Sequence, residues 1–326
     1  MSDSNQTVNF YEWPYRKAFF IFNIIAGVLF VIMHSQMISV ILQTRSLRSM
    51  AGYRFMVHIS AVDLVNCITQ IVAQMCTLNT PYMDPIINEV INGAIFQGTW
   101  AADYPMTLII ALNRVVAVML PFKVRLLFGD NLTYFYIAAC LVFGCMNTAA
   151  CLSGELACVW IAEIPSFAFT TNSVFKDIVE LVDFWFAEVI ILCSTACYIA
   201  ILVYLMQKVL LQRKLLTSSR HELPLLFHFC CIFGITGISL FFWHHPAASN
   251  ALYYEILQTV IVFRFGMPPL AALLVNGSIR NRFFQLRQGK SILMSSTGVH
   301  LTKTRGTVRV STLTAAHTLI PHRSAI

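Results

Sequence analysis

The chain has 326 residues, of which 57% are hydrophobic and 11% are charged, and its mean hydropathy is +0.69. Soluble domains usually carry about 25% charged residues, so this composition excludes a soluble globular protein and indicates a membrane protein. The net charge of +7 is then expected to reflect how the chain is oriented in the bilayer, and not nucleic-acid binding.

The apolar residues are gathered into long runs. Because a bilayer core is about 30 Å thick, each helical crossing needs roughly 20 apolar residues. The sequence predicts seven such helices, at residues 18–42, 53–78, 94–118, 132–152, 182–205, 225–243 and 252–275. The first run is too long for a signal-peptide core, so we expect it to be retained.

These runs predict an all-α membrane protein, a seven-transmembrane-helix bundle over residues 18–288. A short N-terminal segment, residues 1–17, precedes the bundle. The tail over residues 289–326 is rich in Ser, Thr and basic residues, so we expect it to be disordered. Its hydroxyls are candidate phosphorylation sites, and a merely solvated tail is the alternative.

Lysine and arginine are distributed unevenly among the loops. With the N-terminus outside, 18 of the 22 Lys and Arg residues lie on the inner side, whereas only Asp130 and Glu222 of the 15 acidic residues do. The positive-inside rule therefore predicts an extracellular N-terminus, and the basic inner surface would suit anionic membrane lipid. Of the three glycosylation sequons, at Asn5, Asn131 and Asn276, this orientation exposes only Asn5.

Seven of the ten cysteines lie well inside the predicted helices, away from their outer ends, and we interpret them as small buried apolar residues. Cys76, Cys151 and Cys158 lie near the outer face. In that oxidising compartment a disulfide between Cys76 and Cys158 is a candidate pairing, with free thiols as the alternative.

Three charged residues stand out deep inside the apolar runs. Asp63, Asp103 and Arg264 lie 10, 11 and 12 residues from Tyr53, Arg114 and Asn276, which are near the inner helix ends. At about 1.5 Å per residue this is a depth of roughly 15 to 18 Å, so all three are expected near the bilayer midplane. Charges at that depth usually face one another or water. We therefore predict a mid-membrane charge cluster, which would be either a switch or a purely structural ion triad.

Aromatic residues recur along the outer half of the third predicted helix. Phe96, Trp100 and Tyr104 are spaced i, i+4 and i+8, so they share one helix face. Residues of similar predicted depth on neighbouring helices are Trp185, Glu188, Phe241, Trp243, Tyr254 and Gln258. We predict that these line a ligand cleft, with Glu188 binding an amine or accepting a hydrogen bond. Ordinary helix packing is the alternative.

After the seventh helix, basic and apolar residues alternate. Arg280, Arg282 and Arg287 are interspersed with Phe283, Phe284 and Leu286. This pattern predicts a short amphipathic helix that lies on the inner membrane surface.

The end of the third helix reads Leu-Asn-Arg-Val-Val-Ala-Val-Met-Leu-Pro-Phe over residues 112–122. It resembles the rhodopsin-like G-protein-coupled receptors, whose third helix ends Asp-Arg-Tyr, and Arg114, Ala117 and Pro121 match that spacing. The stretch from His58 to Asp63 resembles their second-helix Ala-x-x-Asp motif. The chain departs from the third-helix motif at Asn113, which replaces the acid. The seventh-helix Asn-Pro-x-x-Tyr motif and the turn after it are matched by Pro268, Pro269 and Asn276, but Pro268 replaces the Asn and Ala272 replaces the Tyr. The sixth-helix Cys-Trp-x-Pro and the outer cysteine of the third helix are also missing.

This divergent pattern also includes residues 52–56, Gly-Tyr-Arg-Phe-Met, and residues 127–130, Leu-Phe-Gly-Asp. It is similar to the nematode serpentine chemoreceptors, class T most of all, with class X as the neighbouring class. The resemblance implies a small-molecule cue, a heterotrimeric G protein, and a place in the plasma membrane or sensory cilia. Arrestin and a receptor kinase are further partners that it implies.

The resemblance assigns roles to two of these groups. Arg114 would contact the G protein, and because Asn113 cannot hold it as a carboxylate would, we expect appreciable basal activity, with Glu222 as a candidate substitute lock. Arg114 as a plain positive-inside anchor is the alternative. The charge cluster occupies positions that often hold sodium in that family, so we expect Arg264 to replace the ion and bridge Asp63 and Asp103.

Other function classes have weaker support. The chain shows no paired-aspartate, Ser/His or His-rich metal motif suited to an enzyme, and no Schiff-base lysine for an opsin in residues 252–275. We expect no cofactor, no metal and no nucleic acid. A seven-helix ligand-gated channel, similar to insect odorant receptors, is the runner-up, although its N-terminus would lie inside. A subunit that escorts another receptor is a third possibility.

Overall fold

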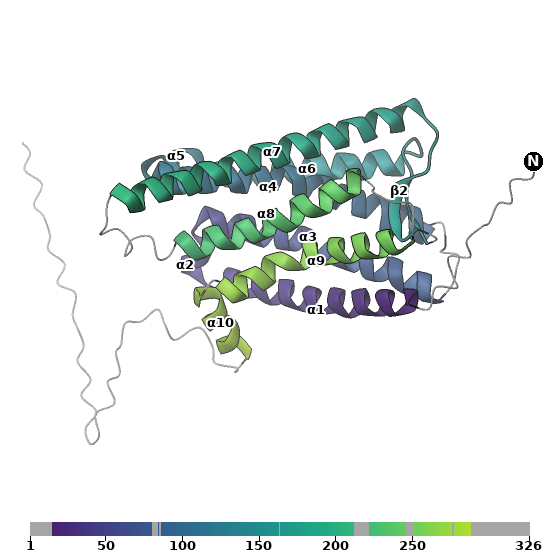
Figure 1. Ribbon diagram of the computed structural model, residues 1–326, viewed down its shortest axis with the longest axis horizontal. Coiled ribbons are helices and arrows are strands. Elements are labelled where there is room, and N and C mark those ends of the chain that lie inside the picture. The colour runs from purple at the N-terminus through teal and green to yellow at the C-terminus, as the bar shows by residue number, and fades with distance from the viewer. Residues whose placement is uncertain are drawn as a thin grey trace, which may run out of the picture. The chain divides into compact units, whose positions relative to one another are not determined.

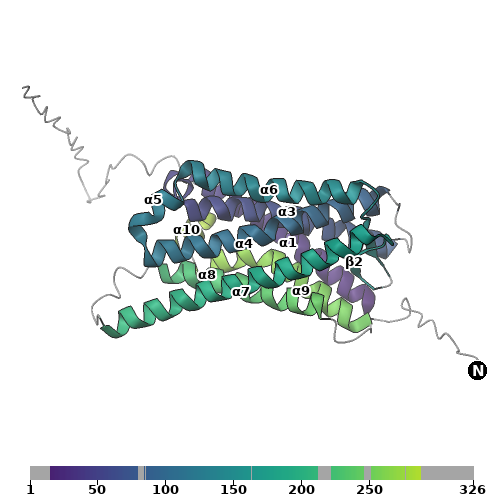
Figure 2. The same ribbon diagram turned by 90° about the horizontal axis from the view of Figure 1, so that it is seen from above.

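The structure is a computed structural model that describes residues 15–79, 84, 86–162, 164–211, 222–245, 251–275 and 277–287. Within these residues the seven predicted membrane helices are present and run alongside one another (Figures 1 and 2). They are α1 (Arg16–Gln43), α3 (Ala51–Asn79), α4 (Ile95–Met119), α6 (Asp130–Leu152), α7 (Val174–Leu211), α8 (Glu222–His244) and α9 (Ala251–Val275).

Helix length and composition support a membrane location. Six of these helices are long and apolar enough to cross a bilayer, and the seventh, α8, contributes a shorter apolar stretch over Cys230–His244. The predicted all-α helix bundle is therefore confirmed for the described residues.

The distribution of side chains is the reverse of that in a soluble protein. Large apolar residues point outward, such as Ile25 on α1, Val142 on α6 and Leu192 on α7, which are 57%, 58% and 66% exposed. Polar residues such as Gln70 and Gln258 are buried between helices, where they are hydrogen-bonded to each other. Lipid tails offer no hydrogen bonds, so polar side chains must find partners inside the bundle.

Short elements mark the two ends of the bundle. At one end lie the start of α1 and the hairpin of β1 (Cys158–Ile161) and β2 (Ser166–Phe169), and we call this the hairpin end. At the other, the Arg114 end, lie α2 (Arg45–Arg48), η3 (Pro121–Lys123), α5 (Val124–Leu127) and α10 (Gly277–Arg287). The 3₁₀ turn of η3 begins at Pro121, whose fixed φ suits a first helical position.

The hairpin was not predicted from the sequence. Its two strands are antiparallel, with Cys158 opposite Phe169 and Ile161 opposite Ser166. The π-helix η2 (Ile86–Ala94), which leads into α4, docks on it. The Asn88 side-chain amide donates to the Trp160 carbonyl (3.0 Å) and accepts from the Trp160 N–H (2.7 Å). It therefore makes the two backbone hydrogen bonds that a third strand would make with Trp160.

A glycine permits the close approach of η2 to the hairpin. A Cβ built on Gly93 would overlap the carbonyl oxygen of Cys158 and lie 2.5 Å from its carbonyl carbon. Because the obstruction is backbone on both sides, any larger residue would push the hairpin away from η2.

Two prolines interrupt the hydrogen-bond ladder of α9. Pro269 has no N–H to donate to the Phe265 carbonyl one turn earlier. The imidazole of His34, on α1 and fully buried, bonds to that carbonyl through Nε2 at 2.7 Å. A side chain from another helix thus satisfies the acceptor that the proline leaves, and lipid could not supply that hydrogen bond.

Helix α7 begins well before the apolar run that predicted it. Ser173 caps its first turn by accepting the Lys176 N–H (3.1 Å) through its hydroxyl, and Lys176 pairs with Glu180 at 3.6 Å. Capping and an i, i+4 ion pair extend the helix beyond the residues that hydropathy can detect.

The helix predicted after the seventh span is present as α10. Ile279 is fully buried against the bundle, whereas Arg280 is exposed and donates to the Leu274 carbonyl at 3.0 Å. Its donation to a carbonyl at the end of α9 holds the turn between the two helices.

Candidate functional site

A buried ion pair lies at the centre of the bundle. Arg264 on α9 donates through Nη2 to a carboxylate oxygen of Asp103 on α4, and the two residues are 3% and 4% exposed. The Thr107 hydroxyl also donates to Asp103. Asp63 on α3 is buried as well and lies within electrostatic range of both partners. The structure therefore places Asp63, Asp103 and Arg264 in one cluster.

Aromatic rings cover this pair on the hairpin side. The guanidinium carbon of Arg264 lies 4.1 Å from the centre of the Trp100 ring and 5.3 Å from that of Phe265. Such cation–π contacts are strongest where water is excluded. The Trp100 indole N–H donates to the Tyr104 hydroxyl, one turn further along α4.

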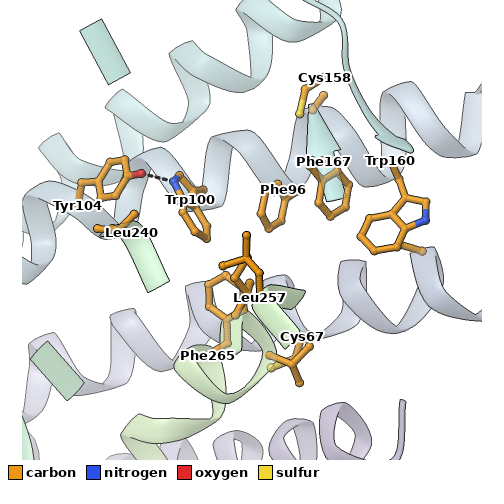
Figure 3. Close-up of a cluster of buried hydrophobic side chains, with 14 of the residues drawn as sticks. Cys67, Phe96, Trp100, Tyr104, Cys158, Trp160, Phe167, Leu240, Leu257 and Phe265 are labelled. Atoms are coloured by element: carbon orange, nitrogen blue, oxygen red, sulfur yellow. Dashed lines mark hydrogen bonds between the residues drawn. The ribbon is translucent and has the colours of Figure 1, made fainter. Parts of the chain in front are cut away.

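The aromatic stripe continues from Trp100 to the hairpin. Figure 3 shows Phe96 between Trp100 and Phe167 of β2, and Phe167 next to Trp160 of β1. The rings of Phe96 and Phe167 are stacked with centroids 4.0 Å apart, and Trp160 meets Phe167 edge-on at 5.1 Å. We refer to Phe96, Trp100, Tyr104, Trp160 and Phe167 as the aromatic column.

Some residues predicted to line the same cleft lie near this column. Trp243 on α8 is 5.8 Å from Trp100, ring to ring, and Tyr254 on α9 packs against the same core. Gln258 is buried but is engaged by Gln70 on α3. All three approach from the α8 and α9 side of the bundle.

Other predicted lining residues point elsewhere. Trp185 and Phe241 are 59% and 55% exposed on the outer surface. Glu188 is partly buried and lies 3.9 Å from His245 at the end of α8, outside the aromatic column. The rotation of α7 explains this, because its buried residues include Ala187, Ile190 and Ser194, and Trp185 lies about 200° from Ala187 at 100° per residue.

The same rotation of α7 places on its buried face a carboxylate that was not among the predicted lining residues. Asp183 is one helical turn before Ala187 on the buried face of α7, and it lies within electrostatic range of Tyr104 and Arg264. The spacing of Asp183, Ala187, Ile190 and Ser194 was the available signal. It was missed because the predicted span began at residue 182, which put Asp183 at the helix end.

A second buried ion pair closes the hairpin end. Arg16, at the start of α1, donates from Nε to Glu255 on α9 at 3.1 Å, with side chains only 4% and 0% exposed. The same guanidinium donates through Nη2 to the Ala162 carbonyl beside β1. This clamp ties α1, α9 and the hairpin together.

The interior on the Arg114 side of the charge cluster is closely packed. A cavity of about 10 Å³ lies there, enough for about one water molecule. Its walls come from six helices, and its lining residues are Met37, Met56, Ile59, Thr107, Ile110, Tyr198, Ile232, Phe233 and Pro268.

Arg114, near the end of α4, is 6% exposed. Its Nη2 donates to the side-chain oxygen of the neighbouring Asn113 at 2.9 Å. Asn113 thus gives Arg114 a neutral hydrogen-bond acceptor in place of a carboxylate. Glu222 begins α8, but its side chain lies outside the described residues, as does Asn276, so the proposed Glu222 lock stays a prediction.

The structure does not form the predicted disulfide, because neither Cys76 nor Cys158 is disulfide-bonded. Trp160, and not Cys158, reaches the end of α3, where its indole donates to Thr77 at 2.9 Å. Cys158 instead lies near Cys151, at the end of α6, and burial raises the pKa of its thiol well above the ordinary value. Asn5, the glycosylation candidate, lies outside the described residues.

A family model described as "Serpentine type 7TM GPCR chemoreceptor Srt" matches residues 4–295 of this chain. Comparison with curated proteins finds no match. The matched region includes every described helix, the charge cluster and Arg114. Members of that family are multi-pass membrane receptors and not enzymes, and as receptors of this type they act in general with small-molecule ligands and G proteins. The chain belongs to the Srt family of serpentine seven-transmembrane chemoreceptors.

Proposed function

We propose that this receptor binds a small-molecule cue at the hairpin end and activates a heterotrimeric G protein at the Arg114 end. The observation that carries the ligand part is the aromatic column, which leads from the hairpin to the buried cation of Arg264. A ligand that displaces Phe167 from Phe96 would contact Trp100 directly. Its binding would then be coupled to the charges that join α4 to α9.

The chemistry of the column indicates the class of cue. The column is made of aromatic rings, and the polar groups near it include the Tyr104 hydroxyl, the carboxylate of Asp183 and the guanidinium of Arg264. Apolar walls with a few polar groups favour a small, largely apolar molecule oriented by one or two hydrogen bonds. Asp183 takes the role that the sequence suggested for Glu188, because it faces the interior.

The proposed orientation has the N-terminus and hairpin outside the cell. The supporting observation is the uneven distribution of Lys and Arg, since Arg45, Arg48 and Arg125 all lie at the Arg114 end. A multi-pass chain with this charge bias keeps its basic end in the cytosol. Plasma membrane, sensory cilia, arrestin and a receptor kinase belong to the same proposal.

The orientation is tested with an epitope tag at the N-terminus and an Asn5→Gln variant in intact cells. Surface labelling of the tag, and a glycan-dependent mobility shift that Asn5→Gln removes, are the expected results. A tag accessible only after permeabilisation would favour the channel-like topology with an internal N-terminus.

Signalling is tested through Arg114. Cells that express the receptor with a panel of Gα subunits are screened with volatile and water-soluble small molecules for calcium or cyclic-nucleotide responses. We expect Arg114→Ala to abolish a response that wild type gives, because a charged contact with the G protein is lost. Arg125→Ala, at an exposed position on the same side, is the matched control. Equal responses from both variants would contradict a coupling role for Arg114.

Two tryptophans distinguish the aromatic column from the lipid-facing surface. Trp100→Phe removes the indole N–H that donates to Tyr104, and it puts a smaller aromatic ring over Arg264. A cue found in the screen should therefore lose about tenfold in potency, equivalent to about 1.4 kcal/mol. Trp185→Phe makes the same chemical change on an exposed ring and should leave potency unchanged. Dose–response curves at matched surface expression measure both, and a larger shift for Trp185→Phe would exclude the column as the binding site.

A further inference from the structure

The guanidinium of Arg114 rests against the first turn of α3, at a point where the backbone carries no side chain. A Cβ built on Gly52 would overlap Nη2 of Arg114 and would lie 2.9 Å from its Cζ and 3.6 Å from its Nη1. These three nearest heavy atoms all belong to the one guanidinium. The missing side chain of Gly52 is therefore the space that the Arg114 head group fills.

The backbone around Gly52 is held firmly. The N–H of Arg54 donates to the Met50 carbonyl at 3.2 Å, and its guanidinium donates to the Arg48 carbonyl at 2.9 Å. Arg54 also pairs with Asp130 at the start of α6 at 2.9 Å. A methyl group added at Gly52 would thus be relieved by movement of the long Arg114 side chain, and not by movement of α3.

The Arg114 guanidinium also has polar neighbours in this place. It donates to the amide oxygen of Asn113, a neutral acceptor whose hydrogen bond is roughly half as strong as that of a carboxylate. The Tyr198 hydroxyl on α7 lies within electrostatic range of the guanidinium, so a displaced Arg114 has another oxygen nearby. The space over Gly52 is therefore a steric requirement for this position of Arg114, which acts alongside its polar contacts.

We propose that Gly52 is a positioning residue that keeps Arg114 in a buried, non-signalling position. The inference rests on the proposed function, in which Arg114 engages the G protein once its guanidinium leaves this place. Gly52 provides the space for the guanidinium, and Asn113 accepts one of its hydrogen bonds. Adding one methyl group at Gly52 removes this space without changing Arg114 itself.

The test compares Gly52→Ala with Gly234→Ala in the full-length receptor. A Cβ on Gly234 meets nothing within 4 Å, so the control adds the same methyl group to an open helix surface. In detergent-purified receptor, labelling of Arg114 by the arginine reagent phenylglyoxal is measured by peptide mass spectrometry, with exposed Arg125 as the internal reference. In cells, ligand-free nucleotide exchange on the G protein is measured at equal surface expression.

We expect Gly52→Ala to raise Arg114 labelling toward the rate of Arg125 and to raise basal exchange on the order of fivefold, while Gly234→Ala changes neither. Adding Arg114→Ala to Gly52→Ala should return basal exchange to background and restore any expression that the methyl group costs. Unchanged Arg114 labelling, unchanged basal exchange in a receptor whose response needs Arg114, or a raised basal rate that survives Arg114→Ala would each overturn the inference. Increased labelling in a receptor that never activates a G protein would support the placement of Arg114 by Gly52 and reject the proposed function instead.

Discussion

Replacing Arg264 with alanine is expected to destabilise the receptor by about 3 to 5 kcal/mol, because the change removes one partner of a buried ion pair. Asp103 would be left at 4% exposure without its counter-charge, and Asp63 would lie beside it. Two carboxylates in a low-dielectric interior repel each other, and neither can be ionised cheaply. Surface expression and the thermal stability of purified receptor in detergent measure the effect.

Charge removal at a second position provides the control. Arg264→Ala combined with Asp103→Asn leaves no uncompensated charge from the pair, so it should recover a substantial part of the lost expression. Arg48→Ala, an exposed arginine of α2, should behave as wild type. If Asp103→Asn rescues nothing, Asp103 is not the counter-ion on which Arg264 depends for stability.

The same variants address whether the cluster is a switch. A purely structural triad predicts that the double variant, once expressed, signals as wild type does. A switch predicts an altered ratio of basal to ligand-driven activity, because Arg264 touches both the aromatic column and α4. Ligand binding can bias only those contacts that differ in energy between the two states.

Loss of the clamp at the hairpin end is expected to have an effect of similar size. Arg16→Ala would leave the Glu255 side chain, which is 0% exposed, without its cation, and breaking such a pair costs about 3 to 5 kcal/mol. It would also free the Ala162 carbonyl beside the hairpin. The expected result is lower thermal stability together with faster proteolysis of the loop that carries β1 and β2.

Neighbouring residues give a matched set for this second prediction. Lys17→Ala removes an exposed positive charge one position along α1 and should leave stability unchanged. Arg16→Ala with Glu255→Gln should recover part of the loss, since a neutral amide is less costly to bury than a charge. Equal stability of Arg16→Ala and Lys17→Ala would show that the clamp does not contribute.

Much of the fold could be predicted because membrane insertion depends on local composition. About 20 apolar residues in a row define a span whatever its neighbours are, and all seven runs correspond to helices. The start of α7 was missed because its first turns are polar and are held by the Ser173 cap and the Lys176–Glu180 pair. The hairpin was missed because its four-residue strands depend on docking against Asn88 and Gly93.

The candidate site was only partly predictable. Periodicity placed Phe96, Trp100 and Tyr104 on one face of α4, and the structure buries all three. Periodicity could not predict how α7 is rotated about its axis. Trp185 and Glu188 were therefore predicted to line the cleft, whereas in the structure Asp183 faces the interior. A rotation of α7 by half a turn would exchange these roles without changing the hydropathy of a single residue.

The sequence by itself determined that this chain crosses the membrane in seven helices, that its basic residues gather at one end, and that charges lie at mid-depth. These properties follow from summed transfer free energies, which depend on residue type and position along the chain. Only the tertiary structure decided which charges meet. Arg264 pairs with Asp103 across 161 positions of sequence, and Arg16 pairs with Glu255 across 239. Such pairs are set by helix rotation and crossing, which arise from packing between helices and leave no local trace in the sequence.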